Sequence, residues 1–284
     1  MKRFLFVFVF CALALTPARA GKVVLDSLYS KTMGATVLFN VYLPGSYSAE
    51  RHYPLVFLLH GLHGTHMDWP SHLVPVADEL MRSGEARKMV IVMPNAGGKD
   101  AERVQNGYFN MPGRSYEDFF FNELLPCVEE RYNCGGKKSQ RAIMGLSMGG
   151  GGSTVYCQRH PEVFSSCYAM SPWLDNESNE VGGRRAARNC MTITMESVRE
   201  HSAIRFVREA SDETVAALRS VHWFFDCGDD DFLLDQSVLI HQLMRKRKIK
   251  DELRVRDGVH NWEYWHTALR TALPFASRNF SNPR

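Results

Sequence analysis

Short apolar runs alternate with helix-like segments along the chain, and this alternation limits the fold more than any other feature. The runs lie at 54–59, 89–93, 142–144, 165–170, 222–225 and 253–255. The continuous runs at 54–59 and 89–93 fit strands that are buried on both faces of a parallel sheet, and the others fit further strands. Helical spacing marks the segments at 71–83, 116–132, 149–160, 232–244 and 262–275. This order predicts an α/β fold in which helices cover both faces of a mostly parallel central sheet.

Two segments fall outside this alternation. Residues 23–44 are rich in β-branched and aromatic residues, which predicts further strand ahead of the first buried run. Residues 173–220 begin with a polar stretch and then turn helical, and we expect a small cap insertion above the sheet. Among the helix ends, Ser71 is the expected N-cap and Gly84 the stop of the first helix. Pro126 is expected to kink the second helix.

The first twenty residues have the three parts of a secretory signal peptide. Lys2 and Arg3 give a positive start, residues 4–15 form an apolar run, and Ala18-Arg19-Ala20 supplies small residues at a cleavage point. The run is shorter than the roughly 20 residues that span a bilayer. We therefore expect cleavage after Ala20, a mature domain over 21–284, and a secreted or periplasmic protein without a membrane anchor.

Charge and cysteine content limit the function of the remaining chain. The first twenty residues hold three basic residues and no acid, so without them the formal net charge falls from +3 to 0. A neutral chain has no excess positive charge to hold nucleic acid or an anionic membrane. Six cysteines remain. At most two disulfides are expected, because Cys157, Cys167 and Cys227 lie in predicted core segments.

A G-x-S-x-G motif, Gly145-Leu146-Ser147-Met148-Gly149, lies between a predicted strand and a predicted helix. In that context the serine stands on a sharp turn, and its hydroxyl projects past the end of the sheet. A serine hydroxyl is a weak nucleophile at neutral pH and needs a general base. The motif therefore predicts Ser147 as a nucleophile that is served by an acid and a histidine later in the chain.

The base and the acid are predicted from their positions after later strands. His260 follows the strand at 253–255, whereas its competitor His266 falls inside the last helix. The strand at 222–225 is followed by four candidate acids, Asp226, Asp229, Asp230 and Asp231. Asp231 is favoured and Asp226 is less favoured, because Asp226 looks like the end of the strand. The residues alone leave Asp229 and Asp230 as alternatives.

Backbone donors for a negatively charged oxygen are expected beside the serine. One is the N–H of Met148, the residue after the nucleophile. The loop His60-Gly61-Leu62-His63-Gly64 follows the first buried strand, and Leu62 N–H is the expected second donor. His60 and His63 raise the question of a metal site, but Asp68, the nearest acid, matches no familiar ligand spacing. We therefore expect no metal and no cofactor.

These segments together resemble the esterase-D-like branch of the α/β-hydrolases, which includes feruloyl, acetyl-xylan and tributyrin esterases, S-formylglutathione hydrolases and mycolyltransferases. The matching pieces extend over nearly the whole chain after residue 20: Tyr42-Leu43-Pro44, 58–64 with Asp68-Trp69, 145–150, 228–233, and 258–262 with Trp265. The resemblance places a catalytic triad on Ser147, Asp231 and His260. It places the oxyanion donors on Leu62 and Met148. Residues 173–220 depart from the pattern.

The resemblance implies a serine carboxylesterase that works through an acyl-enzyme. Export suits esters that are attached to polysaccharide, and aromatic walls suit a cinnamoyl group or a sugar. We expect a feruloyl or acetyl esterase of plant polysaccharide, with substrate contacts from Trp69, Tyr108, Trp173 and Trp262, and Trp265 nearby. The alternatives are acyl transfer to a sugar, or carbohydrate binding on an inactive hydrolase scaffold. The expected partner is a small or polysaccharide-linked ester.

Overall fold

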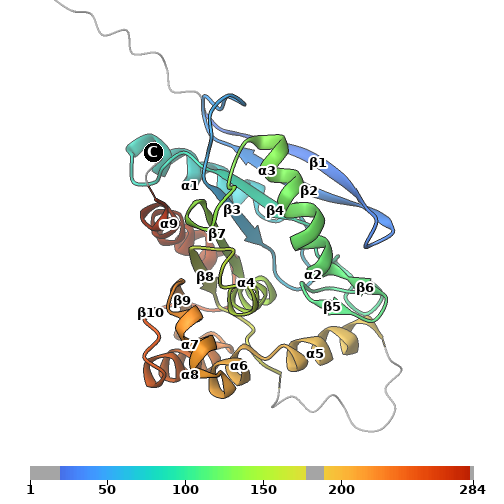
Figure 1. The fold of residues 1–284 in the computed structure, drawn as a ribbon, viewed down its shortest axis with the longest axis vertical. Coiled ribbons are helices and arrows are strands. Elements are labelled where there is room, and N and C mark those ends of the chain that lie inside the picture. The colour runs from blue at the N-terminus through green and yellow to red at the C-terminus, as the bar shows by residue number, and fades with distance from the viewer. Residues whose placement is uncertain (1–19, 177–188, 282–284) are drawn as a thin grey trace, which may run out of the picture.

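The computed structural model describes residues 20–176 and 189–281. Its centre is an eight-stranded sheet in the order β1-β2-β4-β3-β7-β8-β9-β10 (Figure 1). These strands are β1 (Lys22–Ser30), β2 (Ala35–Leu43), β3 (Leu55–Leu59), β4 (Val90–Pro94), β7 (Arg141–Leu146), β8 (Ser166–Met170), β9 (His222–Gly228) and β10 (Asp251–Arg256). The predicted signal peptide up to residue 19, and residues 177–188 of the predicted cap, lie outside the described residues.

Most neighbouring strands are parallel, as the alternation predicts. From β4 to β10 along the sheet every pairing is parallel, and only the pairings of β1 with β2 and of β2 with β4 are antiparallel. All residues of β3, β4 and β8 are buried. The predicted α/β-hydrolase sheet is therefore confirmed, and the carboxyl ends of its parallel strands meet along one edge.

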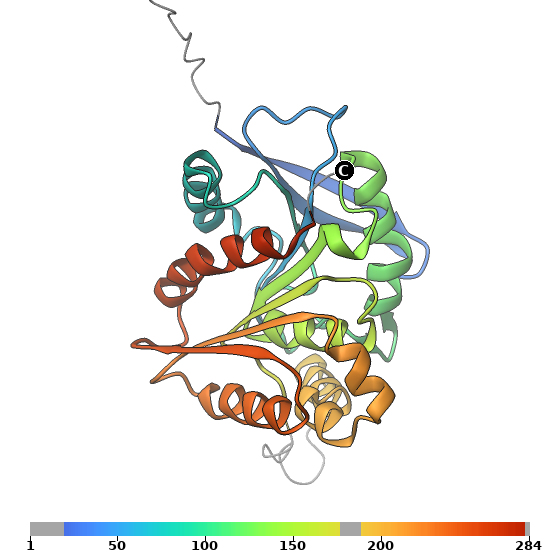
Figure 2. The ribbon, with the colours of Figure 1, turned by 60° about the vertical axis from the view of Figure 1, so that its left-hand side comes forward.

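Helices cover both faces of the sheet and separate two apolar cores. On one face, α1 (Pro70–Ser83) contacts α9 (Trp262–Asn279) (Figure 2). The other face carries α3 (Leu125–Tyr132), α4 (Met148–Arg159), α6 (Ala203–Glu209) and α8 (Leu234–Lys246). Side chains of β3 alternate between the cores: Val56 and Leu58 belong to the first, and Leu55, Phe57 and Leu59 to the second.

The ends of two predicted helices differ in the structure. α1 begins at Pro70, a residue that is well tolerated at the first position of a helix. The predicted N-cap Ser71 therefore lies inside the first turn. Gly84 ends α1 with φ 85°, as predicted. The helix predicted at 116–132 divides into α2 (Tyr116–Phe119), a π-helical turn η1 (Phe120–Leu124) and α3, with Pro126 in the first turn of α3. Pro126 therefore marks a change of helix type, because it lacks the N–H that a continuous α-helix uses.

The described part of the predicted cap lies in two places. α5 (Cys190–Glu200) contacts the hairpin strand β5 (Asn110–Met111), which pairs with β6 (Arg114–Ser115). α6 packs instead on α4 and α8 and buries its apolar residues, Ala203, Ile204 and Val207. α7 (Asp212–Leu218) then leads into β9. α6 therefore belongs to the helical layer on the sheet, which corrects the expectation that this whole segment lies above it.

The six cysteines of the described chain are free thiols. Cys157, Cys167 and Cys227 are buried, as predicted for core segments. Burial raises the pKa of the Cys227 thiol to about 12. In the two described segments no helix combines the length and the apolar character that crossing a bilayer requires.

Candidate active site

Ser147 lies on a tight turn between β7 and α4. Its φ of 53° and ψ of −119° form a conformation that non-glycine residues rarely adopt. A Cβ at Gly145 would come within 2.5 Å of the Gly149 carbonyl oxygen, and a Cβ at Gly149 within 2.5 Å of the Leu59 carbonyl oxygen. Backbone packing thus requires both glycines of the motif. The turn is that of a nucleophile elbow at the carboxyl end of a central strand.

Ser147, His260 and Asp231 form a hydrogen-bonded chain. Nε2 of His260 lies 2.9 Å from Oγ of Ser147. Nδ1 of the same ring lies 3.0 and 2.9 Å from the two carboxylate oxygens of Asp231. Because a carboxylate only accepts, Nδ1 carries the proton, and Nε2 is left to accept from the serine hydroxyl. The structure therefore brings the three residues into the relation of nucleophile, general base and orienting acid.

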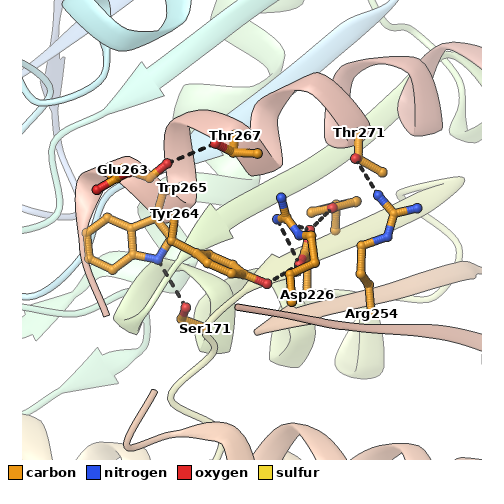
Figure 3. Close-up of polar contacts among 10 residues, drawn as sticks. Ser171, Asp226, Arg254, Glu263, Tyr264, Trp265, Thr267 and Thr271 are labelled. Carbon is orange, nitrogen blue, oxygen red and sulfur yellow. Dashed lines mark hydrogen bonds and ion pairs between the residues drawn. The ribbon is translucent and has the colours of Figure 1, made fainter. Parts of the chain in front are cut away.

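The Asp231 carboxylate is buried and held by several donors. Its side chain has 0% exposure, and Leu233 N–H donates to Oδ1 at 2.9 Å. Burial by itself would raise the pKa of Asp231, but hydrogen bonds from His260, Ser171 and Leu233 outweigh it and lower the pKa below its ordinary value. Trp265 Nε1 donates to Ser171 Oγ at 3.1 Å (Figure 3). Since an indole only donates, the Ser171 hydroxyl proton remains available to Asp231.

The competing residues serve other contacts. Asp229 accepts a hydrogen bond from Gly258 N–H at 2.9 Å, and Asp230 is exposed. Asp226 is a buried member of β9, which extends further than the sequence predicts. His266 lies on α9 with its ring 6.2 Å from that of His72. Asp231 and His260 are therefore the acid and the histidine that hydrogen bonds join to Ser147.

The predicted oxyanion loop lies against the nucleophile. A Cβ at Gly61 would stand 3.5 Å from the Cβ of Ser147, so the residue before Leu62 packs directly on the serine. Met148 opens α4, and N–H groups in the first turn of a helix have no carbonyl partner within it. Both expected donors, Leu62 and Met148, therefore stand close to Ser147. An oxyanion needs preformed donors, and these two N–H groups remain the expected ones.

His60 fixes this loop from inside the molecule. Its Nδ1 donates to the Gly61 carbonyl at 2.8 Å, and its Nε2 accepts from Ala96 N–H at 2.9 Å. Burial lowers the pKa of His60 to about 4, so the ring is neutral. Both ring nitrogens are thus occupied by backbone groups, which gives His60 a structural role. His63 is exposed, and its Nδ1 donates to the Lys99 carbonyl at 2.9 Å.

Two aromatic residues that the sequence assigned to substrate contact are buried instead. Trp69 has 0% exposure, and its Nε1 donates to the Leu59 carbonyl at 3.1 Å. Tyr108 has 1% exposure, and its hydroxyl donates to the His60 carbonyl at 2.9 Å. Trp69 therefore offers no surface to a substrate, and Tyr108 borders only a cavity of about 10 Å³. The prediction for both is corrected: they support the end of β3 and the oxyanion loop from within.

The other two predicted aromatics are partly exposed. Trp262 stacks on the His72 ring with centroids 4.1 Å apart and contacts the rings of Trp69 and Trp265. Trp173 and Met148 line a cavity of about 10 Å³. Such a cavity holds no more than about one water molecule. An aromatic ring is therefore too large for this cavity.

A polar cluster around the buried Asp226 was not predicted. Asp226 accepts from the Tyr264 hydroxyl at 2.5 Å (Figure 3), from Arg256 Nη2 at 2.9 and 3.0 Å, and from the Tyr168 hydroxyl. The cluster joins β8, β9, β10 and α9; Asp231 follows β9, and His260 lies between β10 and α9. The only signal in the sequence was an acid at the end of an apolar strand.

The fold and the geometry at Ser147 define an α/β-hydrolase with a serine nucleophile elbow. The esterase family matches residues 30–276 of the chain. The chain therefore belongs to the esterase family, whose enzyme class is the serine carboxylic ester hydrolases. The family resemblance expected from the sequence is thereby confirmed.

Several known proteins are similar to this chain. The structure of a ferulic acid esterase has 45% sequence identity and a TM-score of 0.86, covering 92% of this chain and 100% of that one. An endo-1,4-β-xylanase/feruloyl esterase of Xylanibacter ruminicola is 27% identical over 51% of this chain, but the match spans only 20% of that protein. An S-formylglutathione hydrolase of Staphylococcus aureus has 19% identity and a TM-score of 0.72, covering 90% of this chain and 99% of that one, and it shares the fold.

Proposed function

We propose that the chain is a serine carboxylesterase in which Ser147 attacks the ester carbonyl. The observation that carries this proposal is the 2.9 Å contact between Ser147 Oγ and His260 Nε2, with Asp231 on the other ring nitrogen. His260 takes the serine proton as Ser147 bonds to the carbonyl carbon, and the N–H groups of Leu62 and Met148 receive the developing oxyanion. Each such donor is worth about 3 kcal/mol in the transition state.

Collapse of the tetrahedral intermediate releases the alcohol, which takes the proton from His260, and leaves the acyl group on Ser147. A water molecule then gives a proton to His260 and attacks the acyl-enzyme. The second intermediate collapses, the acid departs and Ser147 regains its proton. Asp231 orients the imidazole in both steps and stabilises its positive charge.

For the acyl group we propose a ferulate, esterified to plant polysaccharide. The 45% identity to a ferulic acid esterase over its whole length supports this choice. The match to a protein described as both xylanase and feruloyl esterase supports a polysaccharide setting. An acetyl group is the competing acyl group, and a panel of matched acetyl, butyryl and feruloyl esters separates the two. The highest kcat/KM for an ester other than feruloyl would contradict the ferulate assignment.

The test of the nucleophile is the variant Ser147→Ala. Its kcat on any ester that the wild type hydrolyses should fall at least ~10³-fold. Ser153→Ala is a matched control, because the Ser153 hydroxyl donates only to the Gly149 carbonyl in the same helix, at 2.7 Å. A fluorophosphonate should label the wild type at residue 147 and leave Ser147→Ala unlabelled. Retained turnover in Ser147→Ala would exclude the mechanism.

We propose further that the protein is exported and that a signal peptidase cleaves between Ala20 and Gly21. One feature of the described chain supports this position. Gly21 N lies 2.8 Å from Asp78 Oδ1, which also accepts from the Tyr42 hydroxyl at 2.6 Å. A Cβ at residue 21 would come within 2.5 Å of the Tyr42 ring. Cleavage would place a new ammonium group beside the Asp78 carboxylate, and the mass of the exported protein would show whether it begins at Gly21.

A further inference from the structure

Phe232 is a large aromatic side chain that projects into solvent beside the triad. It is 75% exposed, more than any other large apolar side chain in the described part of the molecule. Its ring centroid lies 4.5 Å from that of the His260 imidazole, with the planes 46° apart. Val259, next to His260 in the loop after β10, is 43% exposed and is a second exposed apolar side chain near the triad. Exposed apolar surface at a binding site often marks the place where a ligand is recognised.

The backbone around Phe232 is held on both sides. Asp231 N–H donates to the Gly228 carbonyl at 3.3 Å, and Leu234 N–H donates to the Asp231 carbonyl at 2.9 Å. Leu233 N–H is bound to the Asp231 carboxylate, and the Leu233 side chain is buried. Phe232 is therefore presented from a fixed turn between two anchored residues, which reduces the entropy lost when a ligand binds to it.

The chemistry of the first step decides which part of an ester reaches Phe232. His260 Nε2 must protonate the departing alcohol oxygen, so that oxygen lies within about 3 Å of Nε2. In the proposed mechanism the carbonyl oxygen instead turns to the N–H groups of Leu62 and Met148, because these receive the developing negative charge. A ring that contacts His260 thus contacts the alcohol portion of the substrate more closely than the acyl portion.

We propose that Phe232 is the platform of a leaving-group subsite that takes a sugar ring. A sugar presents a face of C–H groups that packs on an aromatic ring while its hydroxyls remain in water, and so it suits a platform that is open to solvent. A methyl alcohol is too small to cover the ring. The inference rests on the proposed esterase function and deepens it, because it names a residue that selects sugar esters over simple alkyl esters.

The experiment compares two substrates that share one acyl group and differ in the alcohol: methyl ferulate and a feruloylated arabinoxylo-oligosaccharide. In Phe232→Ala the ratio of kcat/KM for the oligosaccharide ester to kcat/KM for methyl ferulate should fall about 3- to 10-fold, the worth of one aromatic contact. Phe232→Tyr should keep the ratio of the wild type, and Phe232→Leu should lose most of it. The fall should appear mainly in KM for the oligosaccharide ester.

Tyr29→Ala is the matched control, because Tyr29 is 65% exposed on β1, at the edge of the sheet and away from the triad. It should leave the ratio unchanged. An equal fall for both substrates in Phe232→Ala would mean that the ring only shields His260, and it would overturn the proposal. If the wild type hydrolyses acetyl esters and neither feruloyl ester, the feruloyl assignment fails. Methyl acetate and an acetylated xylo-oligosaccharide then test the subsite by the same ratio.

Discussion

The hydrogen bonds that His60 makes to the loop beside Ser147 depend on the protonation state of its own ring. Its Nδ1–H is given to Gly61 O and its Nε2 accepts from Ala96 N–H. A proton on Nε2 would face a backbone donor and lose that hydrogen bond. Burial lowers the pKa of His60 from the ordinary 6.5 to about 4, so the folded protein keeps this ring neutral.

We predict that His60 makes the protein less stable as the pH falls from 7 to 5. The folded pKa of about 4 lies below the ordinary value of 6.5, so the unfolded chain gains the proton first and stability is lost between these two values. Over this range the histidine should account for a loss of about 2 kcal/mol. Urea unfolding at both pH values, in wild type and in His60→Gln, isolates the effect. An equal pH dependence in the two proteins would contradict it.

Among single residues, the sequence predicted those that directly follow a recognisable strand. Ser147 and His260 each follow a strand that a continuous apolar run identifies. Four aspartates lie in the end of β9 and the loop after it, and the residue pattern alone left alternatives to Asp231. The family resemblance pointed to Asp231, and its carboxylate lies 2.9 Å from the imidazole. Trp69 and Tyr108 were misassigned because an aromatic side chain next to a strand end can face the core or the solvent. Which way it faces depends on the packing of residues far away in sequence.

Asp226 links elements that are separate in the sequence. Strand β9 provides the carboxylate, β10 provides Arg256, and α9 provides Tyr264. Arg256 also lies over the Tyr264 ring, with its guanidinium carbon 4.5 Å from the ring centroid. Because Asp231 follows β9 and His260 lies between β10 and α9, the cluster sets the distance between the two loops that must meet.

We predict that Asp226→Asn destabilises the fold by about 3 kcal/mol or more, because it leaves a largely buried guanidinium without its counter-ion. Arg278→Gln is a matched control: it breaks an ion pair with Glu252 at 3.0 Å in which both side chains are about half exposed. That change should cost less than about 1 kcal/mol. Urea unfolding at neutral pH measures both variants. A loss of similar size in the two would show that burial adds nothing to the Asp226 cluster.

The elements themselves were largely predictable from apolar periodicity. The six predicted strands and the main helices are present, with ends shifted by a few residues, and no residue of β10 is fully buried. The π-helical turn before Pro126 and the small hairpin of β5 and β6 were not predicted, because neither has a periodic apolar pattern. The segment after Trp173 was predicted as a cap because its start is polar. Ala203, Ile204 and Val207 form too short a pattern to reveal that α6 packs on the sheet layer.

For the whole molecule, the sheet explains why three distant stretches of chain meet. Ser147 follows β7, Asp231 follows β9 and His260 follows β10, and parallel strands end along one edge. The opposite end of the molecule is organised differently. There β1 begins beside α1, and Gly21 N binds Asp78 while Tyr42 closes over the glycine. A side chain at residue 21 would collide with the Tyr42 ring, so the contact between Gly21 N and Asp78 requires glycine.

We predict that Asp78 stabilises the processed chain more than an extended one. In a chain that begins at Gly21 the terminal ammonium faces the Asp78 carboxylate, whereas added residues leave only a neutral amide there. Asp78→Asn should therefore cost about 1 kcal/mol more in the chain that begins at Gly21 than in one with Met-Ala placed before it. Urea unfolding of the four proteins at low salt gives this difference as a double-mutant cycle, and salt should reduce it. Equal losses in both backgrounds would mean that Asp78 acts only through Tyr42, and that the fold does not favour a terminus at Gly21.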